Sequence, residues 1–464
     1  MATGNPSRRS PIVKEGRVEL HYDGKKTVSD ILKTTPSRLT TLWSSSSEMV
    51  NSLIWSENLA ALAALTTQPK IKGKVRLVYI DPPFATQSAF QTRDQRDAYE
   101  DVLGGASFVE FLRERLVLLR DLLADDGSLY LHLDDKMVFA AKLVLDEVFG
   151  QDGFRNCIVR KKCNPKNFTR RAFGNIADYI LFYSKTGDYV WNRQYDPWDE
   201  DRAREYQYVD EVTGRRFMKV PVHAPGVRNG ETGTEWRGRL PPPGKHWQYP
   251  PRVLDEMDAK GEIFWSANGN PRRKVFLDES KGVGVQDIWL DFRDAHNQNI
   301  EITGYPTEKN VSLLSRIVAA SSNEGDLVLD CFCGSGTSLV AADMLGRRWI
   351  GIDASRVAIE TCLRRFALGS DLMGDYVGAK TMREARPTRS IEEFSMILSE
   401  EKSEAGGSLV ESWAELKEKK AARMIELVPE KAVEQQAVLG RRSKQRNGTK
   451  GQIQLPGLFA LEHD

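Results

Sequence analysis

The chain has 464 residues, a formal net charge of +1 and five cysteines. This length can bury a large core and divide into two or three units, and so few cysteines exclude a disulfide framework. No apolar run approaches the length of a membrane span and the polar N-terminus lacks a signal-peptide core, so we expect a cytoplasmic protein. Cys331 and Cys333 have no second Cys or His pair at zinc-like spacing, and no metal site is predicted.

The N-terminal region, residues 1–45, mixes Ser, Thr, Arg and Lys with little periodicity, and we expect an N-terminal arm with one short helix. Residues 51–57 then predict a short strand, and the run of Ala and Leu over residues 60–65 predicts a helix. Glu57 and Asn58 lie where the strand gives way to the helix. They are candidates both for a helix cap and for contact with a ligand.

Residues 75–81 predict a central strand, because Val, Leu, Tyr and Ile dominate the segment. Pro82 and Pro83 end it, since proline cannot donate to a β-ladder and biases the preceding residue away from helix. Asp81 is therefore held at the carboxyl end of a strand, where open α/β sheets bind their ligands. An acid, two proline carbonyls and the ring of Phe84 suit a flat heterocycle that bears an exocyclic amine. A rigid turn without a ligand is the alternative.

A helix, a strand and a second helix follow. Residues 108–123 carry leucines at helical spacing, residues 128–133 alternate as a strand, and a helix is expected from there through Val148. This alternation is typical of a parallel sheet covered by helices.

The segment from Arg155 to Arg171 carries seven cations and no acid. It interrupts two strand-like pieces, and two interpretations stand: a solvated face, or a surface that contacts the phosphates of a nucleic acid. The candidate DNA-binding residues in this segment are Arg160, Lys161, Lys162, Arg170 and Arg171.

Residues 191–300 differ from the rest of the chain in composition, since six of the ten tryptophans lie there among Arg and Lys. Turn signals at 241–244 and 268–271 predict an insertion of irregular and β structure. Aromatic rings among cations are typical of a module that stacks bases and binds phosphates, and the alternative is a small domain whose tryptophans form its core. The candidate DNA-binding residues here are Arg237, Arg239, Arg272 and Arg273.

The alternation of strands and helices resumes with a helix that starts near residue 306 and has Thr307 as its expected N-cap. Residues 327–330 predict a buried strand, residues 331–337 a glycine-rich turn into a helix, and residues 349–353 the next strand. A strand, a glycine turn, a helix and a second strand together form a pattern typical of nucleotide binding.

The glycine-rich turn indicates the class of cofactor. Gly334 and Gly336 let the backbone approach a ligand closely, and Asp353 is placed to bind two ribose hydroxyls. A dinucleotide fingerprint requires a third glycine, where this chain has Leu339. An adenosyl cofactor without phosphates therefore fits the turn better than a dinucleotide.

Together these residues resemble the amino-methylating DNA methyltransferases of the β order, above all the modification subunits of type III restriction systems and their solitary relatives. Asp81-Pro82-Pro83-Phe84 matches the catalytic motif of that family, and Phe332-Cys333-Gly334-Ser335-Gly336 matches its cofactor motif. The long insertion between the two motifs stands where the family has its target-recognition domain.

The resemblance implies an α/β fold with a doubly wound, mostly parallel seven-stranded sheet of the class I S-adenosylmethionine-dependent methyltransferase type, interrupted by a target-recognition domain. The implied units are the N-terminal arm (1–45), a catalytic half (46–190), the target-recognition insertion (191–300), a cofactor-binding half (301–372), a charged helical appendage (373–440) and a flexible tail (441–464). The implied cofactor is S-adenosyl-L-methionine, and its implied binding residues are Glu57, Asn58, Thr307, Lys309, Asp330, Phe332, Gly334, Ser335, Gly336, Thr337 and Asp353.

The resemblance also implies a mechanism on double-stranded DNA. The target base leaves the duplex stack, and Phe84 stacks on it. Asp81 and the Pro82 carbonyl accept hydrogen bonds from the exocyclic amine, which directs the nitrogen lone pair towards the methyl group. The Asp-Pro-Pro form of the motif favours adenine N6 in this family, with cytosine N4 as the alternative.

The C-terminal region alternates Glu and Lys, and we expect a solvated helical appendage over residues 373–440. In the tail, the pattern Gln-Leu-x-x-Leu-Phe at residues 454–459 is similar to peptides that bind the bacterial sliding clamp, so the clamp is a candidate partner. A second copy of the chain and a restriction subunit are further candidate partners that the sequence leaves open.

Three other functions compete with DNA methylation. A nicotinamide oxidoreductase would need the missing third glycine, and a non-catalytic DNA-binding homologue would not need Asp81 and the Gly334/Gly336 pair intact. Methylation of RNA or of a protein amide would use the same amine chemistry, although an Asn-Pro-Pro motif is more usual for a protein amide.

Overall fold

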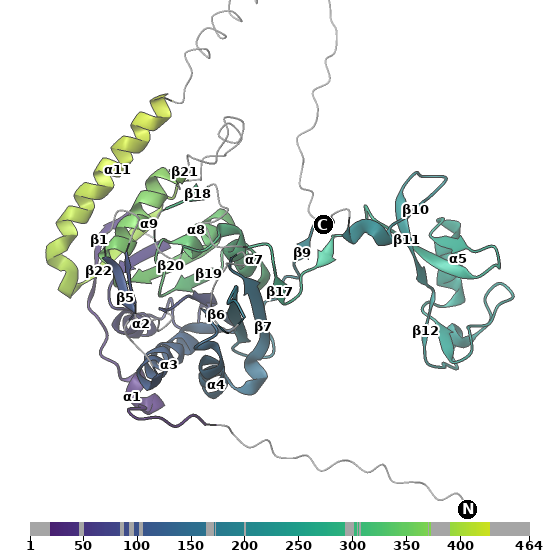
Figure 1. Ribbon diagram of the computed structural model, residues 1–464, viewed down its shortest axis with the longest axis horizontal. Helices are drawn as coiled ribbons and strands as arrows, with labels where there is room; N and C mark the ends of the chain where they lie inside the picture. The colour runs from purple at the N-terminus through teal and green to yellow at the C-terminus, as the bar shows by residue number, and fades with distance from the viewer. Residues whose placement is uncertain are drawn as a thin grey trace, which may run out of the picture.

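Figure 1 shows a large α/β body and a smaller β-rich lobe, to the right, that holds α5. The computed structural model describes most residues of the chain. These are residues 19–45, 51–83, 88–91, 97–101, 105–163, 171, 173–198, 201–292, 301–303, 305, 308–369, 371–372 and 390–426. Within these ranges every helix is too short or too polar to cross a bilayer.

The main sheet has ten strands in the order β1-β22-β2-β20-β19-β3-β6-β8-β7-β17. The six strands from β22 to β6 run parallel, whereas β1 and β8 are antiparallel to their neighbours. The predicted α/β class is confirmed, but three strands, β1, β22 and β17, extend the expected seven. The bounds in sheet order are Leu39–Ser44, Phe394–Ser399, Asn51–Trp55, Arg348–Asp353, Leu327–Asp330, Val75–Ile80, Leu123–Leu133, Ala177–Ser184, Phe154–Lys161 and Ile288–Trp289.

Helices cover both faces of this sheet (Figure 1). Successive strand side chains point to opposite faces, so in β3 Val78 and Ile80 pack in one core whereas Leu77 and Tyr79 pack in the other. One layer consists of α1 (Val28–Leu32), α2 (Asn58–Thr66), α3 (Gly105–Leu122) and α4 (Val138–Phe149). The other consists of α7 (Val311–Ser321), α8 (Thr337–Met344), α9 (Arg356–Leu368) and α11 (Gly406–Glu426).

The direction of the connections reverses between β19 and β3. The chain leaves β3 through α3 and returns in β6 on one side, whereas it leaves β19 through α8 and returns in β20 on the other. Such a reversal opens a crevice at the carboxyl ends of the two strands, where doubly wound sheets bind ligands. Asp81 follows β3 directly and the glycine-rich turn follows β19, so the fold brings the two predicted motifs to this crevice.

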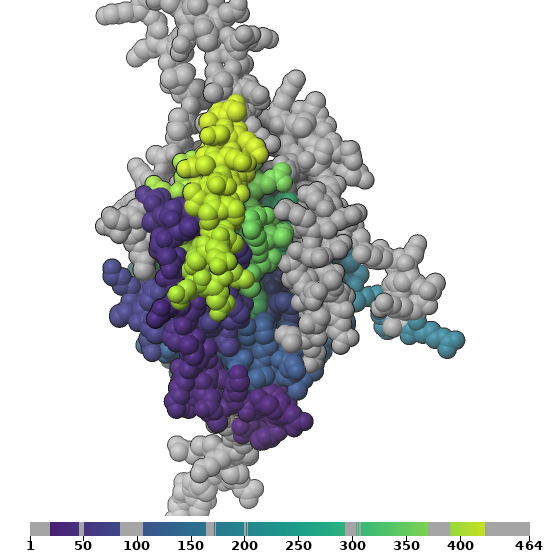
Figure 2. All heavy atoms as spheres, turned by 90° about the vertical axis from the view of Figure 1, so that its left-hand side faces the viewer, coloured from purple at the N-terminus to yellow at the C-terminus, as the bar shows by residue number. Residues whose placement is uncertain are grey.

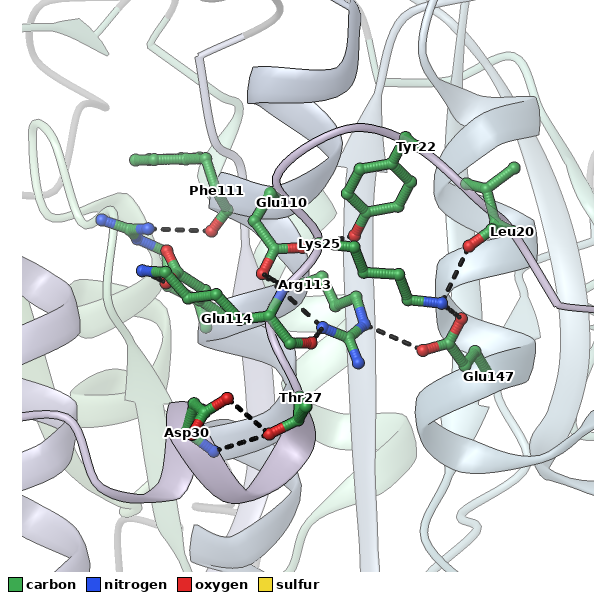
Figure 3. Close-up of polar contacts among 12 residues, drawn as sticks. Leu20, Tyr22, Lys25, Thr27, Asp30, Glu110, Phe111, Arg113, Glu114 and Glu147 are labelled. Carbon is green, nitrogen blue, oxygen red and sulfur yellow. Dashed lines mark hydrogen bonds and ion pairs between the residues drawn. The ribbon is translucent and has the colours of Figure 1, made fainter.

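The described part of the N-terminal region is not a loose arm. Figure 3 shows residues 20–30 packed against α3 and α4 through charged contacts: Lys25 Nζ lies 2.7 Å from a carboxylate oxygen of Glu147, and the Tyr22 hydroxyl donates to Glu110. The one expected short helix is present as α1. Residues 39–44 then form β1, which extends the main sheet. The sequence missed this attachment because the contacts that hold the segment lie about a hundred residues away.

The C-terminal region also joins the body, contrary to the expectation of a solvated appendage. Strand β22 inserts between β1 and β2, and Phe394 at its start is fully buried. Helix α11 lies across the outer face of the body (Figure 2), where Trp413 stacks on Trp43 with ring centroids 6.2 Å apart. Its exposed face carries the alternating charges that suggested a solvated helix.

The β-rich lobe is the middle of the predicted insertion and has its own core of Val222, Trp236, Trp247, Leu254, Met257 and Ile263. The alternative interpretation therefore holds for Trp236 and Trp247, which are core residues. A sheet of β10 (Tyr208–Val209), β11 (Arg216–Pro221), β15 (Pro271–Phe276) and β14 (Ile263–Trp265) accompanies a pair formed by β12 (His223–Pro225) and β13 (Lys245–Trp247), and α5 (Pro251–Ala259).

Three two-stranded ribbons complete the described structure. The ribbon of β9 (Tyr195–Asp196) and β16 (Val283–Gly284) forms the neck between lobe and body (Figure 1). The others pair β4 (Ser88–Gln91) with β5 (Asp97–Asp101) and β18 (Glu301–Ile302) with β21 (Asp371–Leu372). Because β17 already belongs to the main sheet, the lobe ends before residue 288 rather than at 300.

Candidate active site

A cavity of about 340 Å³ lies at the carboxyl ends of β3 and β19. It joins the two predicted motifs, which are 253 positions apart in the sequence when counted from Asp81 to Gly334 (334 − 81). The predicted site residues that line it are Glu57, Asn58, Asp81, Pro83, Lys309, Asp330, Phe332, Gly334, Ser335, Thr337 and Asp353. The acid that follows β3 and the glycine-rich turn that follows β19 therefore open onto one shared cleft.

The other predicted site residues do not line this cavity. Pro82 is buried, and Gly336 is not among the residues that border it. Phe84, Thr307 and Arg170 lie outside the described residues, so their predicted roles stay predictions. The expected N-cap of α7 is corrected: the side chain of Asn310, not Thr307, caps this helix by accepting the Ser312 N–H at 2.8 Å.

Asp81 has two carboxylate oxygens in different surroundings. Oδ2 contacts the ammonium of Lys309, and the two side chains are 16% and 8% exposed. Oδ1 is buried and has no hydrogen-bond partner among the described residues. A buried acceptor without a donor is costly, and in native structures such groups are frequently functional.

The conformation of the turn between β19 and α8 explains why positions 334 and 336 are glycines. Gly334 and Gly336 both have positive φ, +49° and +73°. A Cβ on Gly336 would also lie 2.9 Å from Cys362 Sγ, and one on Gly334 would lie 3.2 Å from the Tyr305 ring. Gly336 therefore shapes the turn from behind, whereas Gly334 borders the cavity.

Two acids flank this turn: Asp330, which is buried, and Asp353, which is half-buried. Asp330 accepts the Phe332 N–H at 2.9 Å and the Ser338 hydroxyl at 2.5 Å. Asp353 accepts the Gly334 N–H at 2.9 Å and the Ser355 N–H at 2.8 Å. Neither acid has an ion-pair partner among the described residues, and burial raises the pKa of Asp330 to about 7 and that of Asp353 to about 6. The cavity therefore favours a ligand that brings positive charge or hydrogen-bond donors.

A buried arginine holds the start of α2 against the cavity. Arg115 on α3 donates to Asn58 Oδ1 and to Glu57 Oε1, each at 2.5 Å, and its guanidinium lies 3.5 Å from the centroid of the Phe111 ring. Glu57 also caps α2 by accepting the Ala60 N–H at 3.0 Å, which confirms the helix-cap interpretation, and its contact with a ligand stays a prediction. Arg115 was not predicted, because it is one of several charged residues in an amphipathic helix and its sequence position gives no sign of its partners.

The segment that carries Lys309 is fixed by a second buried ion pair. Glu308 lies 3.1 Å from Arg365 on α9, and both side chains are 2% exposed. Glu308 also accepts the backbone N–H and the hydroxyl of Thr303, each at 2.8 Å, and Arg365 donates to Thr337 Oγ1 at 2.8 Å. This pair was not predicted, because it joins residues that are close only in the folded chain.

A polar chain runs behind the cavity from Tyr79 into the sheet. The Tyr79 hydroxyl lies 2.9 Å from His132 Nδ1, and His132 Nε2 lies 3.4 Å from Asp178. Burial lowers the pKa of His132, so the imidazole is neutral. Asp178 also lies 3.2 Å from Arg160 and 2.9 Å from Lys162.

This polar chain corrects the predicted DNA-binding role of Arg160. Its side chain is fully buried and donates to Asp178 and to the Phe292 carbonyl, so it cannot reach a phosphate. Lys162 is half-buried and paired with the same acid. Arg171 is exposed and Lys161 half-buried.

In the lobe, the predicted DNA-binding arginines also differ from one another in their exposure and in their partners within the protein. Arg272 is exposed, whereas Arg273 donates to the Tyr249 hydroxyl at 2.8 Å. Arg237 is ion-paired with Asp255 and Asp258. Arg239 donates to the Asn268 carbonyl at 3.0 Å.

The cavity residues fit S-adenosylmethionine. This molecule carries a sulfonium, an ammonium and two ribose hydroxyls, which match the acids Asp330 and Asp353. The rings of Phe111 and Phe332, with centroids 5.9 Å apart, provide an apolar border for an adenine. When bound, the cofactor supplies an electrophilic methyl group.

A family model described as DNA methylase matches residues 75–364, which include both motifs and the whole lobe. The type II methyltransferase M.EcaI of Enterobacter cloacae is 48% identical over 383 residues, which are 81% of this chain and 84% of that protein. The Mod subunit of the type III restriction-modification enzyme StyLTI of Salmonella typhimurium is 24% identical and covers 72% of this chain. The match spans only 55% of that Mod subunit.

Solved structures give weaker matches. A DNA modification methylase of Thermus thermophilus complexed with S-adenosyl-L-methionine is 18% identical, with a TM-score of 0.36, over 68% of this chain and 95% of that one. The cytosine-N4-specific PvuII DNA methyltransferase is 14% identical, with a TM-score of 0.36, over 72% and 91%.

The family model covers more than half of the chain, and the Enterobacter relative covers four-fifths of it. The family is S-adenosylmethionine-dependent and includes enzymes for adenine N6 and for cytosine N4. The chain has these relatives, and its cleft places an acid-tipped strand beside a glycine-rich turn. The chain therefore belongs to the DNA methylase family, and the protein is an S-adenosylmethionine-dependent DNA methyltransferase.

Proposed function

We propose that the enzyme methylates N6 of adenine at a specific sequence in double-stranded DNA, after the base has been flipped out of the duplex. The observation that carries the proposal is the cavity shared by Asp81 and the glycine-rich turn. An amine brought to Asp81 in this cavity would lie next to the cofactor. The Asp-Pro-Pro form of the motif favours adenine over cytosine, by the resemblance described above.

Each residue of the catalytic motif has a defined role in this proposal. Asp81 and the Pro82 carbonyl accept the two N–H groups of the exocyclic amine, which localises the nitrogen lone pair, and Phe84 stacks on the base. A positioned acid–base group contributes about 10²–10⁴ in rate. The proton released from nitrogen passes to Asp81 or to solvent.

We propose further that the lobe, which is the middle of the predicted insertion 191–300, is the target-recognition domain. The lobe projects from the body on the β9–β16 neck (Figure 1), and it carries exposed cations such as Arg272. Arg171 and Lys161 would contact phosphates from the body. The relatives of the enzyme include a type II methyltransferase and a type III Mod subunit, and we therefore place it in a restriction-modification context. The enzyme would act either with a restriction subunit as its partner or by itself.

Single-molecule sequencing of DNA from cells that express the protein tests the proposal. We expect N6-methyladenine at one recurring sequence. N4-methylcytosine at that sequence would overturn the choice of base, and DNA without any modification would contradict the proposal as a whole.

The variant Asp81→Ala tests the role of the acid. We expect methyl transfer to fall by at least about 10²-fold while the dissociation constant for S-adenosylmethionine stays within about threefold, because the acid acts on the amine. Calorimetry and a methylation assay measure the two quantities, with the exposed Asp125→Ala as the control. Loss of cofactor binding would mean that Asp81 is structural.

A further inference from the structure

The carboxylate of Asp81 is held asymmetrically. Its Oδ2 contacts the ammonium of Lys309, whereas its Oδ1 is buried without a hydrogen-bond partner among the described residues. The two residues are 228 positions apart, and both line the cavity. The two oxygens of a carboxylate are equivalent until a partner distinguishes them, and here Lys309 does so.

The main chain that carries Lys309 is anchored on both sides. The preceding residue, Glu308, is bound to Arg365 and Thr303 inside the protein. The following residue, Asn310, caps α7. A lysine ammonium on its four-carbon side chain is normally mobile. Here the main chain on both sides of Lys309 is anchored and the side chain is only 8% exposed, which indicates a fixed position for the ammonium.

We propose that Lys309 is a positioning residue of the methyl transfer: it holds Oδ2 of Asp81 so that Oδ1 receives an N–H of the amine of the target base. This inference rests on the function proposed above. The buried Oδ1 then has a purpose, since the incoming amine supplies the missing donor. The resemblance assigned Lys309 to the cofactor, and the contact with Asp81 assigns it to the acceptor of the base instead.

The reason for such a residue lies in the geometry of the transfer. The amine nitrogen must present its lone pair in line with the methyl group, and its direction is set by the acceptors of its two N–H groups. A carboxylate free to rotate would offer either oxygen and spread the amine over several orientations. A misplacement of about 1 Å can cost about 100-fold in rate, so a fixed carboxylate is valuable.

Three variants test the proposal. Lys309→Met keeps the length of the side chain without its charge, Lys309→Arg keeps a cation, and Lys142→Met removes a lysine–aspartate pair on α4, outside the cavity. In single-turnover methylation with saturating cofactor, we expect a loss of about 100-fold for Lys309→Met, partial rescue to within about tenfold for Lys309→Arg, and no change for Lys142→Met. The dissociation constant for S-adenosylmethionine should stay within about threefold in all three.

A thermodynamic cycle separates positioning from a merely structural role. The dissociation constants of two DNA duplexes are measured with the enzyme in the presence of S-adenosylhomocysteine. Both duplexes contain the sequence that the enzyme recognises, in unmethylated form. One has the normal target base, and the other has the same base without its exocyclic amine (purine for adenine, pyrimidin-2-one for cytosine). We expect the amine to add about tenfold in affinity for the wild type and for Lys309→Arg, but less than about twofold for Lys309→Met.

Equal contributions of the amine in the wild type and in Lys309→Met would overturn the proposal. So would a Lys309→Met enzyme that loses cofactor binding and regains its full rate at high cofactor concentration, because Lys309 would then serve the cofactor. The proposed function is tested separately, by whether the wild-type enzyme methylates DNA. That test does not depend on either of these results.

Discussion

Two carboxyl groups that line the cavity have pKa values raised towards neutral pH, and a cationic ligand would favour their ionised forms. Asp330 is buried and Asp353 is half-buried, and neither has a cationic partner among the described residues. Burial raises their pKa values to about 7 and about 6. Both are fixed by hydrogen bonds from the main chain, so they cannot turn towards water. Their ionised forms are disfavoured until a positive ligand arrives.

We therefore predict that the affinity for S-adenosylmethionine rises with pH. A cationic ligand lowers the pKa of a neighbouring acid, so binding releases protons wherever the free acid is still protonated. The affinity should increase by about tenfold between pH 5.5 and 7.5 and level off above the pKa of Asp330. Calorimetry in buffers of different ionisation enthalpy measures both the affinity and the protons released.

The variant Asp330→Asn provides the control for this pH dependence. Its side chain cannot ionise but can still accept the Phe332 N–H, so the rise of affinity above pH 6 should shrink. An affinity for the wild type that falls as the pH rises, or proton uptake on binding, would contradict the prediction.

At the level of elements, the C-terminal strand β22 is part of the sheet and not an attachment to it. The ring of Phe394 lies 5.4 Å from Phe366 on α9, 5.3 Å from Trp413 on α11 and 6.2 Å from Trp349 on β20, measured between centroids. These rings join one strand to three other elements, so β22 and the cofactor half of the body should unfold together.

We predict that Phe394→Ala lowers the free energy of unfolding by about 3–5 kcal/mol, the usual cost of a cavity left by a buried phenylalanine. Urea denaturation followed by tryptophan fluorescence measures this change, and the cofactor-binding activity should be lost at the same urea concentration. Glu415→Ala, on the exposed face of α11, should leave stability unchanged. A variant as stable as the wild type would mean that β22 is only loosely attached.

At the scale of the whole molecule, the lobe and the body are two structural units. The lobe is connected to the body through the β9–β16 neck, where Asp196 and Val283 are paired neighbours. Arg316 on α7 is ion-paired with Asp196 and ties the neck to the body. The lobe has its own core, so neither part needs the other to bury its apolar side chains.

We predict that replacing residues 197–282 by a short Gly/Ser hairpin gives a folded protein that binds S-adenosylmethionine within about threefold of the full chain. A two- to five-residue loop can close an antiparallel pair such as Asp196 and Val283. Sequence-specific methylation should be lost, because the proposed target-recognition domain is gone. Calorimetry and sequencing of DNA treated with the protein measure the two properties. Methylation of the same sequence by the shortened protein would move recognition to the body.

The sequence by itself determined the parts of this protein that depend on local pattern. The acid and prolines after residues 75–80, the glycine turn after residues 327–330 and the spacing between them are local features. They were enough to predict the α/β class and to place each motif at the end of a strand. The seven-strand expectation fell short because β1 and β22 mix apolar residues with Thr and Ser and lie outside the alternation of strands and helices that indicated the sheet.

Only the tertiary structure decided which side chains meet. Lys309 reaches Asp81, Arg115 reaches Glu57 and Asn58, and Arg160 turns inward to Asp178 rather than outward to DNA. Each of these contacts joins residues that are separated in the sequence, and for Arg160 and Asp178 the register of β7 and β8 places the two residues opposite each other. A charged residue carries the same letters in the sequence whether it faces water or a buried partner, because burial is a property of what packs against it.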